Sequence, residues 1–63
     1  MSKSSIKSVY LETARPGPNG HDDAYFESSE TVKLWLEDGH VHVQTNGKHF
    51  SYPSGAARVI EWT

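Results

Sequence analysis

The chain has 63 residues, no cysteine, and a net charge of −2 that results from six basic and eight acidic side chains. A chain of this length forms a single domain, here residues 1–63, which buries only about 60% of its unfolded surface. Without cysteine it has no disulfide and no thiolate nucleophile, and its slight negative charge disfavours a nucleic-acid binder that works by neutralising phosphates.

Residues 1–4 are polar, so we expect this segment to be frayed. The N-terminal residues lack the apolar stretch of a secretory signal. No apolar run of the chain approaches the roughly 20 residues that are needed to cross a bilayer. We therefore expect a cytoplasmic protein that has no contact with a membrane.

Residues 5–13 are rich in β-forming side chains and predict a first strand. Within it we expect Val9 and Leu11 to face the core, with Tyr10 and Ile6 on the outer side. A long loop over residues 14–25 is expected to follow, because this segment contains two prolines, two glycines and an asparagine in close succession. Proline fixes φ and removes a backbone donor, so these residues disfavour a regular element.

Three short runs of alternating side chains come next and predict an antiparallel meander. Its strands are expected at residues 30–37, 40–45 and 48–52. The dipeptides between them are Asp38-Gly39 and Asn46-Gly47. Both suit a two-residue type I′ turn, which needs a positive φ at its two central residues.

Two-residue turns fix the register of a meander, and the register decides which side chains share a face. One face of the predicted meander is apolar and carries Val32, Leu34, Leu36, Val41, Val43, Phe50 and Tyr52. The other face is mostly polar and carries Lys33, Trp35, Glu37, His40, His42, Gln44, His49 and Ser51. We expect the first face to form the core, and the second to face solvent or a partner.

Two segments admit a second interpretation. Residues 29–38 also fit a helix with Ser29 as its N-cap, although the alternation of their apolar residues favours a strand. Residues 54–63 fit a helix with Ser54 as its N-cap. We expect instead a single 3₁₀ turn at residues 54–57 and then a short closing strand.

The predicted elements give an all-β domain, either a five-stranded antiparallel sheet or a small barrel. Their order is strand, long loop, three-stranded meander, single turn and short strand. This order resembles the layout of SH3-like and Sm-like small barrels over most of the chain. The resemblance is one of topology, without signature residues of either family, and fold analogy alone transfers no function.

The polar face of the meander is the candidate site, because it carries Trp35 and tryptophan is enriched at the centre of protein interfaces. The predicted contact residues for a protein partner or a second subunit are Lys33, Trp35, His40, His42, Gln44 and His49. In the opposing interpretation, residues 14–25 or Trp62 cover the indole. An edge strand at residues 6–11 or 59–62 would also allow a homodimer to form by strand pairing.

Two alternative functions use overlapping residues. A zinc site would need the side chains of His40, His42, His49 and Glu37 to converge. A nucleic-acid-binding barrel would stack bases on aromatic rings beside lysines, and the candidates are Tyr10, Tyr25, Trp35, Lys7, Lys33 and Lys48. No cofactor is implied, and no activated nucleophile or spaced carboxylate pair indicates an enzyme. We therefore predict a non-enzymatic binding or accessory module of bacterial or phage type.

Overall fold

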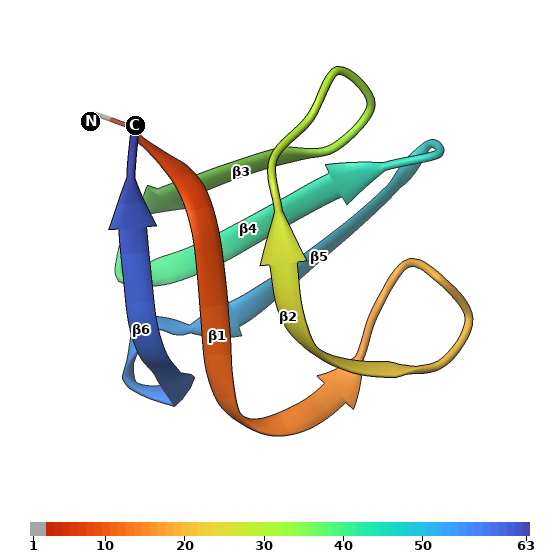
Figure 1. The fold of residues 1–63 in the computed structure, drawn as a ribbon, viewed down its shortest axis with the longest axis horizontal. Helices are drawn as coiled ribbons and strands as arrows, with labels where there is room; N and C mark the ends of the chain where they lie inside the picture. The colour runs from red at the N-terminus through yellow and green to blue at the C-terminus, as the bar shows by residue number, and fades with distance from the viewer. Residues whose placement is uncertain (1–2) are drawn as a thin grey trace.

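The computed structural model describes residues 3–63, and these form six β-strands, one 3₁₀ turn and no α-helix (Figure 1). The elements are β1 (Ser4–Pro16), β2 (Asp22–Glu27), β3 (Lys33–Glu37), β4 (His40–Thr45), β5 (Lys48–Pro53), η1 (Ser54–Ala56) and β6 (Ala57–Trp62). The helix considered for residues 29–38 is therefore wrong. The single turn followed by a closing strand is confirmed.

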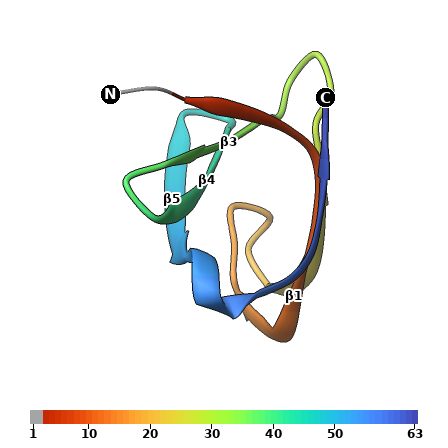
Figure 2. The ribbon, with the colours of Figure 1, turned by 90° about the vertical axis from the view of Figure 1, so that its left-hand side faces the viewer.

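The strands of the described chain form one antiparallel sheet in the order β2-β1-β3-β4-β5, with β6 paired to β1. Strand β1 is the common member: its first residues pair with β3, and residues further along it pair with β2 and β6. Because β1 curves between these partners, the sheet curls into a half-barrel (Figure 2). The predicted small all-β domain is confirmed.

The central meander has the predicted turns and register. Asp38 and Gly39 have φ values of 54° and 73°, and Asn46 and Gly47 have values of 53° and 73°. Positive φ at both central residues is the mark of a type I′ turn, whose twist matches that of the flanking strands. In the resulting register, Val43 pairs with Leu34 on one side and with Phe50 on the other.

The core lies on the concave side of the curled sheet, and the predicted apolar face of the meander supplies half of it. The buried cluster consists of Ile6, Val9, Leu11, Phe26, Leu34, Val41, Val43 and Tyr52. The other predicted inner residues, Val32, Leu36 and Phe50, are partly buried against this cluster. Each fully buried side chain of this size contributes about 1.5–3 kcal/mol of transfer free energy. Because the cluster contains side chains of both β1 and the meander, neither part can bury its apolar surface without the other.

The outward position predicted for Ile6 is wrong, because its side chain is buried, with 1% exposed. The cause is a shift in the pairing of β1 with β6: Ile6 pairs with Trp62, and Ser8 pairs with Glu61. One extra residue on β1 therefore makes a β-bulge, which changes the alternation of sides along the strand. Ile6 and Val9 consequently both face inward although they are three residues apart.

The loop predicted over residues 14–25 is also wrong in its extent, because β1 runs to Pro16 and β2 begins at Asp22. The chain reverses over only residues 17–21, where the proline and glycine signals are concentrated. Among the described residues, β2 pairs with β1 alone, so it is an edge strand. Its short length and charged residues are typical of edge strands. Because of these charged residues, the sequence of β2 shows no clear alternation of polar and apolar side chains, although Phe26 is buried.

Two smaller predictions also concern β1. Residues 1–2 of the segment predicted to fray lie outside the described residues, whereas Ser4 is already the first residue of β1. Residues 6–11 do not form an edge strand, because β1 is paired with β2 and β6 on its two sides over part of this stretch. Over the described chain, β6 pairs only with β1, so its other side is an open edge.

A buried tyrosine joins the meander to the end of β1. The hydroxyl of Tyr52 donates a hydrogen bond to the carbonyl oxygen of Pro16 at 2.7 Å, and its ring stacks on Phe26 with centroids 5.7 Å apart. Burial raises the pKa of the Tyr52 phenol, the charge of Asp23 raises it further, and Arg15 opposes both effects. The folded state therefore favours the neutral phenol over the phenolate.

We predict that Tyr52→Phe lowers the free energy of unfolding by about 1 kcal/mol at neutral pH, since the Pro16 carbonyl loses its donor. A raised pKa in the folded state means that the stabilisation is present below the ordinary tyrosine pKa and is lost as the pH rises through the raised value. Urea unfolding from neutral to alkaline pH should therefore show a smaller alkaline loss for the variant. Parallel pH profiles for the two proteins would contradict this role.

Candidate functional site

The polar side of the meander, here called the outer meander face, consists of Lys33, Trp35, Glu37, His40, His42, Gln44, His49 and Ser51. Trp35 lies at its centre and is half-buried. Its indole stacks on the imidazole of His42, its register partner on β4, with centroids 5.1 Å apart and planes at 10°. The ring of His49 on β5 lies 5.5 Å from the indole, so three strands contribute to one aromatic cluster.

The indole has two further partners. Its N–H donates a hydrogen bond to Oε1 of Glu37 at 3.1 Å. The ammonium of Lys3 lies 5.0 Å from the ring centroid and approaches from the side of β1, where Ser5 pairs with Trp35. The side chains that cover Trp35 are therefore its neighbours on the outer meander face together with Lys3. Trp62, which we also considered as its cover, is 48% exposed.

The hydrogen bonds of the two clustered histidines indicate which tautomer each neutral ring adopts. Nε2 of His42 lies 3.2 Å from the carbonyl oxygen of Glu37, and because a carbonyl oxygen only accepts, this nitrogen carries the proton. Nδ1 of His42 lies 3.0 Å from Nε2 of His49. When both rings are neutral, His49 is therefore the donor of this bond. Both nitrogens of His42 are then already occupied within the protein.

This bonding leaves the outer meander face poorly suited to a metal ion. His40 uses Nδ1 in a contact with the carbonyl oxygen of Asp38 at 2.9 Å, and the carboxylate of Glu37 accepts the indole N–H of Trp35. Among residues 3–63, no group of three or more histidine, aspartate or glutamate side chains is arranged to hold a metal. The predicted convergence of His40, His42, His49 and Glu37 therefore has no support from this geometry.

The aromatic rings predicted to stack on nucleic-acid bases, those of Tyr10, Tyr25 and Trp35, do not form one continuous surface in the structure. Tyr10 of β1 and Tyr25 of β2 contact each other, with ring centroids 4.5 Å apart. Both rings are exposed on the part of the sheet formed by β1 and β2. Trp35 instead contacts rings of β4 and β5. The predicted rings thus form two separate aromatic contacts.

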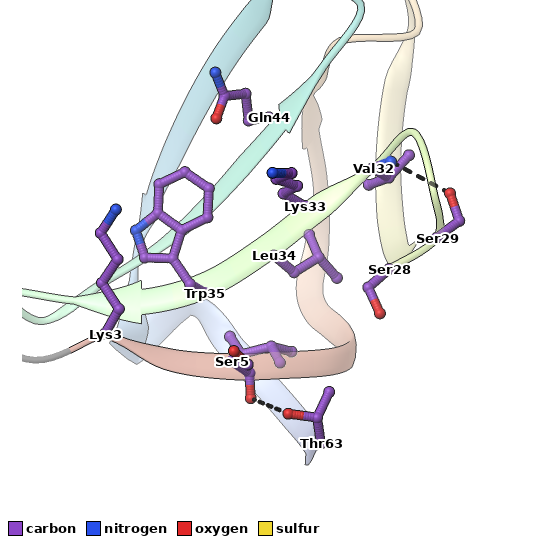
Figure 3. Close-up of a pocket in the computed structure, with 11 residues that line it drawn as sticks. Lys3, Ser5, Ser28, Ser29, Val32, Lys33, Leu34, Trp35, Gln44 and Thr63 are labelled. Atoms are coloured by element: carbon purple, nitrogen blue, oxygen red, sulfur yellow. Dashed lines mark hydrogen bonds between the residues drawn. The ribbon is translucent and has the colours of Figure 1, made fainter.

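An open groove adjoins the outer meander face on the β1 side of Trp35 (Figure 3). Its volume is about 470 Å³, within the usual range for a site that receives a small ligand or a side chain. The half-buried Val32 and Trp35 supply its accessible apolar surface, and the buried Ile6 and Leu34 lie beneath it. Two predicted contact residues that form a register pair, Lys33 and Gln44, stand at its rim. We call this feature the Trp35 groove.

The structure places the predicted contact residues on one face, but they lie at two different ends of it. His40 is exposed beside the first turn, whereas Lys33 and Gln44 lie at the groove. Sequence analysis missed the groove residues outside the meander, namely Lys3, Ser5, Ile6, Ser28, Ser29 and Thr63. These come from distant parts of the chain and meet because β1 starts beside β3 and also contacts Ser28 and Thr63 through main-chain hydrogen bonds. A pairing of that range leaves no local pattern that could have indicated it.

Comparison with known proteins places no constraint on function, because no protein family, curated protein or solved structure matches this chain. The described residues contain no helix with the length and apolar character that crossing a membrane requires.

We predict that Glu37→Ala loosens the cluster, because the half-buried indole N–H of Trp35 loses its acceptor. The free energy of unfolding should fall by about 1 kcal/mol, and the indole N–H should exchange faster with solvent in NMR spectra. Glu37→Gln keeps an acceptor oxygen at this position and serves as the matched control. Equal exchange rates in the two variants would contradict the hydrogen bond.

Proposed function

We propose that this protein is a non-enzymatic binding module of the cytoplasm that contacts a protein partner through the outer meander face and the adjoining Trp35 groove. The observation that carries this proposal is the combination of a rigid aromatic cluster with an open groove. Rigid aromatic side chains beside a pocket are typical of the residues that dominate the binding energy of protein interfaces. An accessory role of the bacterial or phage type is compatible with this small single site.

The geometry of the cluster supports binding by a preorganised surface. Trp35 is held by His42 and His49 through ring contacts and by Glu37 through a hydrogen bond. A side chain that is already fixed loses little conformational entropy when a partner docks, so more of the contact energy appears as affinity. The exposed residues around it, such as Lys33 and Gln44, provide the polar rim that such interfaces usually have.

Self-association is the second form of this proposal, and the open edge of β6 favours it. Over the described chain this strand pairs on one side only, with β1. Unpaired main-chain groups of an edge strand can pair with a second copy. Val59 and Trp62 of β6 are 55% and 48% exposed, so such a contact would also bury apolar surface. A homodimer formed in this way would leave the Trp35 groove free.

The test is affinity capture from the cells that produce the protein, with wild type and two tryptophan variants side by side. Gln44→Trp places a large uncharged side chain at the rim of the groove, whereas Thr13→Trp adds the same side chain at an exposed position of β1. We expect the amount of one captured protein to fall at least about tenfold with Gln44→Trp, which is the size of a hot-spot effect. Thr13→Trp should capture this protein as wild type does.

Circular dichroism melting of both variants controls for folding, since the two substituted side chains are exposed. Sedimentation velocity of the purified protein then separates a partner from a second copy. Capture of the same proteins by all three forms would refute a role for the groove. A concentration-dependent dimer that Gln44→Trp leaves intact would point to the β6 edge instead.

A further inference from the structure

The charge around the Trp35 groove differs from that of the whole chain. Lys3 and Lys33 both line it, and none of its described lining side chains is a carboxylate. Among residues 3–63, neither lysine forms an ion pair. The chain as a whole has a net charge of −2, so this groove is a locally positive site on an acidic protein. Such a site attracts a negatively charged ligand.

The groove also runs along an open piece of strand. The register pairs between β1 and β3 are Ser4 with Leu36 and Ser5 with Trp35. Lys33 and Leu34 have register partners on β4 but none on β1. In an antiparallel hairpin the N–H and C=O groups of successive residues point alternately to the two sides of the strand, so those of Lys33 pair with Gln44 on β4 and those of Leu34 point toward the groove. Because β1 has turned away there toward β2 and β6, Leu34 can exchange main-chain hydrogen bonds with a segment of another chain.

The state of Trp35 distinguishes a polypeptide from a nucleic acid. A protein that binds single strands offers free aromatic faces on which bases stack. Here the indole is already stacked on His42 from the β4 side and contacted by Lys3 from the β1 side. Its N–H is bonded to Glu37. The ring can therefore form a wall of the groove, but it offers little open surface to a base.

We infer that the Trp35 groove receives an extended, acidic segment of a protein partner. The carboxylates of this segment lie at Lys3 and Lys33, and its main chain runs beside Leu34 of β3. Its smaller side chains contact the half-buried Val32 and the indole of Trp35. This inference rests on the proposed function and specifies the chemistry of the partner.

The experiment is an NMR titration of the nitrogen-15-labelled protein with a blocked octapeptide of alternating glutamate and threonine. We expect the largest shifts at the amides of Ser5, Lys33 and Leu34 and at the indole N–H of Trp35. The same peptide with glutamine in place of glutamate should bind about tenfold more weakly, because two exposed charge pairs are lost. A peptide with a central proline should also bind more weakly, since proline removes a donor and fits a strand poorly.

Two protein variants locate the charge effect. Lys33→Gln should weaken binding of the acidic peptide by roughly two- to fivefold, as expected for one exposed ion pair. Lys48→Gln removes a lysine at the turn between β4 and β5, outside the groove, and should leave the affinity unchanged. Added salt should weaken binding to the wild type more than to Lys33→Gln.

Three results would overturn the inference: equal binding of the glutamate and glutamine peptides, shifts that map away from the groove, or tighter binding of an oligothymidylate of eight residues. The last result would identify a single-stranded nucleic acid as the occupant. The proposed function fails separately, when Gln44→Trp captures the same proteins as wild type. If the peptide does not bind but Gln44→Trp still loses its partner, the inference is wrong and the groove binds a protein segment of another charge.

Discussion

The register of the meander is the constraint on which the rest of this structure depends. Two type I′ turns, at Asp38-Gly39 and Asn46-Gly47, fix it through positive φ at both central residues. A shift by one residue would move every side chain of a strand to the opposite face. Val43 would then leave the core, and the ring of His42 would replace it. The same two turns therefore define the core and align Trp35 with His42 on the other face.

The curvature of β1 converts this meander into a domain with a groove. Strand β1 shares two register pairs with β3 and then leaves it to pair with β2 and β6. The core closes because Ile6, Val9 and Leu11 of β1 pack on the apolar face of the meander. The same departure opens the space beside Trp35. The half-barrel thus leaves Lys33 and Leu34 of β3 without register partners on β1, beside the two lysines of the groove.

The features that could be predicted from sequence are those set by neighbouring residues. A two-residue turn imposes the pairing of β3, β4 and β5 directly, so both faces of the meander follow from it. The bulge that turns Ile6 inward adds one residue to a strand and breaks the alternation without any sequence signal. The contact of Lys3 with Trp35 depends on pairing between distant strands. The outer meander face was therefore predictable, whereas the groove beside it was not.

Two aspartate substitutions at adjacent positions of β4 test this account most directly. Val43 has no exposed surface, and Gln44 is exposed on the opposite face. A buried, unpaired carboxylate costs several kcal/mol, a large share of the stability of a small domain. Thermal melting followed by circular dichroism should show that Val43→Asp is unfolded, whereas Gln44→Asp melts within a few degrees of wild type. Equal loss of stability in the two variants would contradict the assignment of the two faces.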